Sequence, residues 1–464
     1  MSKPIEDADL RGATAFQHLH WLAGGRIDSV RLTSACLAAI ERDAARLNAW
    51  IALDPTALQQ AAASDERRRN GQAIGRLDGL TVAIKDNLDV AGLVTSAGLP
   101  GRAGRVADSD AGVVARLRAA GAVILGKTNL DEGSLGTFGA NPHFGPVHNP
   151  LRHGYTTGGS SAGSAVAVAA GHCSFAIGSD TLGSVRIPAS HCGVYGLRPT
   201  HGEISTRGML GAARRLDCVG ILGRAAEDLA IVINVLGAHD PADPRSRRRR
   251  VPLAPPDWEP GRLSSGLLAD LAAFGVDAQI QALFERAVER LGNHLGQRRT
   301  VDFQARDLGR TRRAALLLME AELAVELAHD LDDTRHPVSP RLRAMLDYAR
   351  GKSAPDYVRA DRTLDAAILE ARDLFVGVDV LVLPSVPHAA YPLAEGERAN
   401  DADLSGFASL GGCPAISVPM GTLANGLPVG LQLVGRPGSD LRLLELAAIC
   451  ATTLDAAPAF PVAA

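Results

Sequence analysis

Residues 155–200 decide the fold and read YTTGGSSAGSAVAVAAGHCSFAIGSDTLGSVRIPASHCGVYGLRPT. A glycine pair precedes two adjacent serines, Ser160 and Ser161, and a helix start made of small residues follows them. The later turn SDTLGSVR carries another serine, Ser184, behind a run of backbone N–H groups. Because a serine hydroxyl is a weak nucleophile at neutral pH, it needs a nearby base that removes its proton. Two serine-bearing turns so close together favour nucleophilic catalysis.

The segments before this stretch predict a parallel α/β layer. In GLTVAIKDN, Leu80, Val82 and Ile84 form a short apolar strand that ends at Lys85. A helix and then a buried strand at 122–125 come next, and this order is typical of a parallel sheet. Burial after apolar residues would lower the pKa of Lys85, so that this lysine could act as a neutral base without any histidine.

The segments after this stretch predict a return to the sheet. Residues 278–375 have mostly helical patterns, and the apolar run VDVLVLP follows them as a buried strand. Two further strands in SVPMGTLANGLPVGLQLVG are joined by the turn Asn425–Gly426. We therefore expect one large α/β unit with an appended helical lobe.

The composition excludes several classes of protein. The chain has 464 residues, with 48 Lys and Arg against 51 Asp and Glu, a net charge of −3. This balance gives no basic footprint for nucleic acid or an anionic membrane, so we expect neither partner. The hydrophobic share of 46% and charged share of 21% are those of a globular protein. Six scattered cysteines and a polar start without a secretory signal favour a cytoplasmic location.

The glycine and serine motifs resemble the amidase signature family. The family pattern is GGSS, a small-residue helix, a DTGGSIRIPA-like turn and a GLKPT-like ending, and this chain has GGSSAGSAVAVAAG, SDTLGSVRIPAS and GLRPT in that order. The segments VAIKDN, GKTNLDE, HFGPVHNP, CPAISVPMG and GLPVGLQLVGRP also resemble family segments, so the likeness covers nearly the whole chain. The chain departs from the pattern at Ala162 and Leu182, where the family usually has glycine.

The resemblance implies the amidase signature fold, which is α/β with a mixed central sheet covered by helices on both faces, together with a helical lobe. It implies a single large amidase domain over residues 1–464. Within it we expect the signature core at about 75–225, the variable helical lobe at about 265–375 and the C-terminal return to the sheet at about 376–464.

The resemblance also implies roles for individual residues. Ser184 is the expected nucleophile and Lys85 the expected base. Ser160 is the expected bridging serine, behind a cis peptide bond with Gly159. The remaining expected sets are the oxyanion hole (backbone N–H groups of Thr181, Leu182, Gly183 and Ser184), the supporting residues (Gly158, Gly159, Asp180 and Arg186) and the substrate pocket (Phe138, Thr157 and Leu182).

The implied function is an amidase, a hydrolase of carbon–nitrogen bonds other than peptide bonds. It would cleave a small or medium carboxamide, urea-like or carbamate substrate through a seryl acyl-enzyme, releasing an acid and ammonia or an amine. Residues 205–220 resemble allophanate hydrolases, which favours urea-derived substrates. The alternative is the A subunit of a glutamyl-tRNA(Gln)/aspartyl-tRNA(Asn) amidotransferase complex. A homodimer and a small partner subunit both stay open, and a non-enzymatic scaffold is disfavoured because the serine–serine–lysine set is intact.

Two further interpretations compete with this one. The sequence GSSAG at 159–163 matches GxSxG, which would make Ser161 the nucleophile, but no clear apolar strand precedes it. The histidines could suggest a metal site, yet none has the spacing of a zinc-ligand motif, so we expect no metal and no cofactor. The histidines in question are His143, His148, His153 and His191.

Overall fold

A single large sheet runs through the molecule in the computed structural model, which describes residues 5–248, 260–302 and 308–456. Its eleven strands are β1 (Trp50–Leu53), β2 (Thr81–Lys85), β3 (Val123–Thr128), β6 (Phe175–Asp180), β7 (Tyr195–Arg198), β8 (Cys218–Gly223), β9 (Ser264–Leu268), β10 (Gln297–Val301), β11 (Val380–Pro384), β12 (Ala415–Thr422) and β13 (Pro428–Gly435). The strand order is β1-β3-β2-β6-β8-β7-β12-β13-β11-β9-β10. A small separate hairpin joins β4 (Ala140–Asn141) and β5 (Gly145–Pro146).

The sheet is mixed, as predicted. The neighbours β3, β2 and β6 are parallel, and so are β11, β9 and β10. Antiparallel pairs join the strands between these two groups. Because the carboxyl ends of parallel strands meet at one edge, the ends of β3, β2 and β6 place their polar residues side by side.

Helices cover both faces of this sheet. α6 and α7 contact each other and pack on the middle strands, whereas α15 contacts α8 and α9 in a second layer. The helices are α1 (Asp7–Gly12), α2 (Ala15–Ala23), α3 (Ser29–Leu47), α4 (Ala57–Arg69), α5 (Gly112–Ala119), α6 (Ala162–Ala169), α7 (Arg186–Cys192), α8 (Ala226–Leu236), α9 (Ala278–Leu291), α10 (Leu308–Glu326), α11 (Ala328–Asp332), α12 (Pro340–Arg350), α13 (Ala354–Asp373), α14 (Gly406–Gly411) and α15 (Asp440–Leu454).

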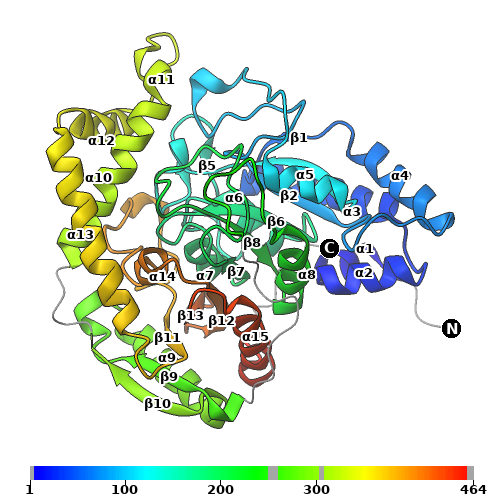
Figure 1. Cartoon of the computed structure of the whole chain (residues 1–464). Helices are drawn as coiled ribbons and strands as arrows, with labels where there is room; N and C mark the ends of the chain where they lie inside the picture. The colour runs from blue at the N-terminus through cyan, green and yellow to red at the C-terminus, as the bar shows by residue number, and fades with distance from the viewer. Residues whose placement is uncertain (1–4, 249–259, 303–307, 457–464) are drawn as a thin grey trace.

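The predicted helical lobe contains both helices and sheet. Helices α10, α12 and α13 pack together and stand on one side of the molecule in Figure 1. However, β10 falls within 278–375, where the sequence pattern predicted mostly helix, and almost all of β9 falls within the expected lobe at 265–375. β10 reads QRRTV and is largely exposed at the sheet edge, so it lacks the alternation of apolar residues that signals a strand. Residues 303–307 and 457–464 of the predicted ranges lie outside the described residues.

The buried apolar side chains form two separate clusters. The first, here called the main core, fills the space between the large sheet and its covering helices. The second, here called the lobe core, joins α10–α13 to residues such as Leu99, Leu135 and Leu216. Leu182, partly buried, also packs against the lobe core. Among the described residues, no helix has the length and apolar character needed to cross a membrane.

Candidate active site

Lys85 ends strand β2, and every residue of that strand is buried. Its side chain is 0% exposed, and its Nζ lies 2.7 Å from Ser160 Oγ and 2.8 Å from Ser179 Oγ. Asn87 Nδ2 donates to the same Ser179 hydroxyl at 3.1 Å. Ser179 comes from β6, which runs parallel to β2, so the lysine and this serine meet at neighbouring strand ends.

Burial lowers the pKa of Lys85 to about 7, because a charged ammonium loses its hydration there. The carboxylates of Asp131, Asp180 and Asp217 act in the opposite direction and limit this fall. Burial together with the Glu397 carboxylate raises the pKa of Asp131 to about 7. A substantial fraction of Lys85 is therefore neutral near pH 7 and able to accept a proton.

The loop that carries Ser160 is shaped by its two glycines. Gly158 has a φ of +68°, which a side chain would disfavour, and the peptide bond between Gly159 and Ser160 is cis, as the family resemblance implies. A Cβ atom on Gly159 would lie 1.9 Å from Asp131 Oδ2, so only glycine fits there. Both carboxylate oxygens of Asp131 accept the Gly139 N–H, at 3.0 and 3.1 Å, which fixes this carboxylate beneath the loop.

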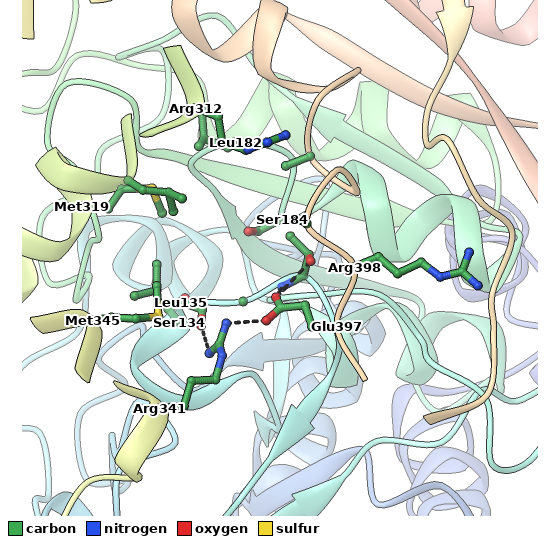
Figure 2. Close-up of a pocket in the computed structure, with 15 residues that line it drawn as sticks. Ser134, Leu135, Leu182, Ser184, Arg312, Met319, Arg341, Met345, Glu397 and Arg398 are labelled. Carbon is green, nitrogen blue, oxygen red and sulfur yellow. Dashed lines mark hydrogen bonds and ion pairs between the residues drawn. The ribbon is translucent and has the colours of Figure 1, made fainter. Parts of the chain in front are cut away.

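Ser184 lies in the turn between β6 and α7 and reaches a cavity of about 340 Å³, here called the serine cavity (Figure 2). The Ser161 N–H donates to the Ser184 carbonyl at 3.1 Å, which ties the two serine loops together. Ser161 itself is fully buried, and its hydroxyl donates to the Ser179 carbonyl at 3.1 Å. The geometry therefore favours Ser184 over Ser161 as the group that meets a substrate.

A buried ion cluster holds the Ser184 turn. Asp180 accepts hydrogen bonds from Arg186 Nε and Nη2, at 3.0 and 2.8 Å, and from Arg198 Nη1 at 3.0 Å. All three side chains are 0% exposed, and the two guanidinium groups hold the pKa of Asp180 well below its usual range. Arg186 also donates to the Ser405 carbonyl and to Gln432 Oε1, at 2.7 and 2.6 Å. The predicted pair of Asp180 and Arg186 is thus present and extended by Arg198.

The four backbone N–H groups expected in the oxyanion hole differ in their availability. The Gly183 N–H donates to Asp180 Oδ1 at 2.9 Å and is therefore occupied. Those of Thr181, Leu182 and Ser184 have no hydrogen-bond partner within the described part of the chain. Thr181 is anchored through its hydroxyl, which donates to Asp217 Oδ1 at 2.6 Å. The turn thus offers free N–H donors next to the Ser184 hydroxyl.

One ion pair lines both the serine cavity and a neighbouring cavity. The serine cavity has an apolar wall that includes Leu182, while Arg341 and Glu397 lie at its rim, joined by a hydrogen-bonded ion pair (Figure 2). The same two residues also line a second cavity of about 360 Å³, here called the side cavity. Phe138 lines the side cavity, whereas Thr157 is fully buried and its hydroxyl donates to the Gly158 carbonyl. Of the three residues predicted for the pocket, the structure thus brings Leu182 alone to the cavity with Ser184.

The four clustered histidines share no common partner in the part of the chain that the structure describes. His143 Nε2 pairs with Glu132 at 2.8 Å, and His191 Nε2 contacts the His388 carbonyl at 3.1 Å. The rings of His148 and His153 stack with centroids 4.0 Å apart. In the described ranges, no three His, Cys, Asp or Glu side chains are grouped so that they could hold a metal ion.

A sequence model of the amidase family matches residues 31–444. The chain belongs to the amidase family. This confirms the resemblance to the amidase signature family and makes the protein an amidase, an enzyme of carbon–nitrogen bond cleavage. Among similar sequences, the A subunit of the glutamyl-tRNA(Gln) amidotransferase of Anaeromyxobacter sp. (strain K) is 36% identical over 479 aligned residues, covering 95% of this chain and 96% of that protein.

Solved structures give the same answer for the fold. The peptide amidase of Stenotrophomonas maltophilia matches with a TM-score of 0.81 and 29% identity, over 97% of this chain and 99% of that chain. A protein from a vestigial complex that bears on the origins of an s-triazine catabolic enzyme matches with a TM-score of 0.87 and 29% identity, over 96% of this chain and 99% of that chain. Both matches confirm the predicted fold class.

Several residues of this amidase site were missed by the sequence analysis. Ser179 and Asn87 contact Lys85 or its partner, and Asp131 supports the Ser160 loop. All three stand at or just after the carboxyl ends of the parallel strands β3, β2 and β6. Polar residues at neighbouring parallel strand ends were thus a usable signal. Glu397 and Arg341 carried no such signal, because they come from segments far away in the sequence.

The buried cluster around Asp180 predicts a large effect on stability. Asp180→Asn removes the carboxylate charge and leaves Arg186 and Arg198 buried without it, so we expect the free energy of unfolding to fall by about 3–5 kcal/mol. Urea denaturation followed by circular dichroism measures this change. As a control, Arg350→Ala removes an exposed ion pair with Asp347 and should cost no more than about 1 kcal/mol. Equal losses in the two variants would contradict the structural role of Asp180.

Proposed function

We propose that this amidase hydrolyses a small or medium carboxamide, urea-like or carbamate substrate through a seryl acyl-enzyme on Ser184. The observation that carries the proposal is the contact of 2.7 Å between Lys85 Nζ and Ser160 Oγ, beneath the cavity that Ser184 lines. A buried lysine with a pKa of about 7 suits a general base at neutral pH.

In the proposed mechanism, Ser184 Oγ attacks the carbonyl carbon of the substrate. Its proton passes to Ser160 Oγ, and the Ser160 proton passes to the neutral amine of Lys85. The negative charge that develops on the carbonyl oxygen is stabilised by the free backbone N–H groups of the turn at 181–184. Lys85 then returns the proton to the leaving nitrogen through Ser160, so that the carbon–nitrogen bond breaks and an ester on Ser184 remains.

The size and lining of the serine cavity support a compact substrate. A volume of about 340 Å³ lies at the small end of the range of about 300–1,000 Å³ that is usual for small-molecule pockets, which suits a molecule of modest size. Leu135, Leu182 and Met345 give it an apolar wall, and the ion pair of Arg341 with Glu397 limits its length. An amide with a short, largely apolar acyl group fits this lining.

The second candidate function is that of the A subunit of a glutamyl-tRNA amidotransferase. It is supported by relatives of that name that are 31–36% identical over more than nine-tenths of this chain. Such a role would require partner subunits and would bring tRNA to the assembly, contrary to the expectation of no nucleic-acid partner. Purified protein that hydrolyses simple amides in the absence of other chains supports the first function, whereas glutaminase activity that depends on a co-purified partner supports the second.

The proposal also includes a cytoplasmic location and a small-molecule substrate as the partner. All six cysteines are buried free thiols, which fits a reducing cytoplasm. The proposed hydrolysis uses a small-molecule substrate and needs no metal, cofactor, nucleic acid or membrane. A homodimer is compatible with it.

The nucleophile is tested with Ser184→Ala. We expect the amidase rate on a panel of amides, ureas and carbamates to fall by about 10³-fold or more, because the acyl-enzyme can no longer form. A fluorophosphonate probe should label the wild type at Ser184 and leave the variant unlabelled, as read by peptide mass spectrometry. The matched control is Ser161→Ala, which should keep the label. Labelling at Ser161 would overturn the assignment.

The base is tested by the pH dependence of kcat/KM. Because protonated Lys85 cannot accept a proton, the rate should rise with pH through the pKa of about 7 and then level off. Lys85→Ala should lose most of the activity and also this rising limb. A limb of unchanged position in the variant would show that another group is the base.

The ion pair at the cavity rim is tested with Glu397→Ala. This change removes the acceptor of Arg341 and of the Thr137 N–H, and we expect the serine and side cavities to merge. The kcat/KM ratio for long over short acyl amides should rise about tenfold, because one fitted methylene contributes about 1–3 kcal/mol. Glu395→Ala is the control, since Glu395 lies on the same loop but pairs with Arg398 and lines neither cavity. An equal ratio in both variants would contradict this role of the ion pair.

A further inference from the structure

Beside the proposed base Lys85 lies a third serine hydroxyl, that of Ser134. The proposed mechanism does not use this hydroxyl. Its Oγ lies 3.3 Å from Ser160 Oγ and 3.5 Å from Ser179 Oγ. Since both of those hydroxyls contact Lys85 Nζ, the four groups close into a ring of polar contacts. The contacts of Ser134 are the long ones, and such contacts in an enzyme without substrate often shorten when substrate binds.

Ser134 is also the ring member that reaches the serine cavity. It lines this cavity together with Ser184, as Figure 2 shows, whereas Lys85, Ser160 and Ser179 are absent from the lining. Lys85 and Ser160 are 0% and 1% exposed. A water molecule inside the cavity can therefore approach the buried base through Ser134.

The backbone of Ser134 is unusual for a serine. Its φ is +61°, in the left-handed region that is unfavourable for a residue with a side chain and open to glycine. The conformation is held by the Ser134 N–H, which donates to the Asp131 carbonyl at 2.9 Å. Backbone strain of this kind is concentrated at functional sites, and here it lies within hydrogen-bond reach of a proposed catalytic group.

Deacylation, the second half of the reaction, requires a path for a proton from the hydrolytic water to Lys85, and Ser134 can provide it. In the acyl-enzyme, Ser184 Oγ is esterified and has no proton to pass to Ser160. The hydrolytic water must still lose a proton to Lys85, which does not line the cavity. A hydroxyl that contacts both the cavity and Ser160 supplies that connection.

We propose that Ser134 is a catalytic residue of deacylation, an inference that rests on the proposed acyl-enzyme at Ser184. The water oxygen bonds to the acyl carbon, and a water proton passes to Ser134 Oγ. The Ser134 proton passes to Ser160 Oγ, and the Ser160 proton passes to Lys85 Nζ. The bond from the acyl carbon to Ser184 Oγ then breaks, and the Lys85 proton returns through Ser160 to Ser184 Oγ. One water is consumed, one carboxylic acid is released, and every group regains its starting protonation.

The test uses Ser134→Gly with an acyl p-nitroanilide substrate. Glycine adopts the same φ without strain, so the fold is kept while the hydroxyl is removed. Loss of a general acid–base group typically costs at least about 10²-fold, and we expect kcat to fall by that order. Since kcat/KM reports acylation, it should stay within about threefold of wild type while KM falls together with kcat.

Two further measurements distinguish this role from a structural one. Intact-protein mass spectrometry during turnover should show the acyl-enzyme accumulating in Ser134→Gly but not in wild type. Hydroxylamine, a stronger nucleophile than water, should restore turnover of the variant and give the hydroxamate. Ser134→Ala should show the same kinetic pattern, because it also lacks the hydroxyl. Its Tm should be lower than that of Ser134→Gly, because alanine keeps the backbone strain that glycine relieves.

The results that would overturn the inference are specific. An equal fall of kcat and kcat/KM without acyl-enzyme, or an unchanged kcat in folded Ser134→Gly, would show that Ser134 takes no part in deacylation. These outcomes are separable from failure of the proposed function. In that case the fluorophosphonate probe would leave Ser184 of the wild type unlabelled, and Ser184→Ala would remain active.

Discussion

The site depends on one buried carboxylate. Asp180 ends β6, and its two oxygens bind Arg186, Arg198 and the backbone of the turn that carries Ser184. Two buried cations around one anion are tolerable only because nearly every donor has a partner, among them the Ser405 carbonyl and Gln432. The position of the nucleophile turn is thereby coupled to α14 and β13, although these elements lie more than two hundred residues further along the chain.

The pKa of Lys85 depends on a balance between burial and nearby carboxylates, one of which is Asp180. A fully apolar surrounding would make the lysine a base that almost never carries its proton, and a close carboxylate would keep it charged. In this site the pKa of Lys85 lies between these two extremes. The carboxylates that act on Lys85 each have other hydrogen-bond partners, such as Gly139 for Asp131 and Thr181 for Asp217. The lysine can therefore both accept and return a proton near neutral pH.

The sequence predicted the site best where the functional residues and the local structure that holds them lie in the same short segment. The strand ending at Lys85 was predicted from alternating apolar residues, the Ser160 turn from its glycine pair and the Ser184 turn from the run SDTLGSVR, because these features arise within a few residues. Ser134 and Glu397 were not predicted, because the role of each depends on contacts with other segments of the chain. β10 escaped for a different reason, because an exposed edge strand with Arg298 and Arg299 has no apolar face to reveal it.

The two separate apolar cores have a consequence for how such an enzyme changes over time. The main core holds the sheet with Lys85 and the Ser184 turn, while the lobe core holds the helices that close the cavity from the other side. A mutation that reshapes α10 or α12 is taken up mainly within the lobe core, which meets the catalytic half through a few residues such as Leu135 and Leu182. Selection for a new amide can therefore act mainly on the lobe and on these contact residues, while Lys85 and its strand stay within the main core.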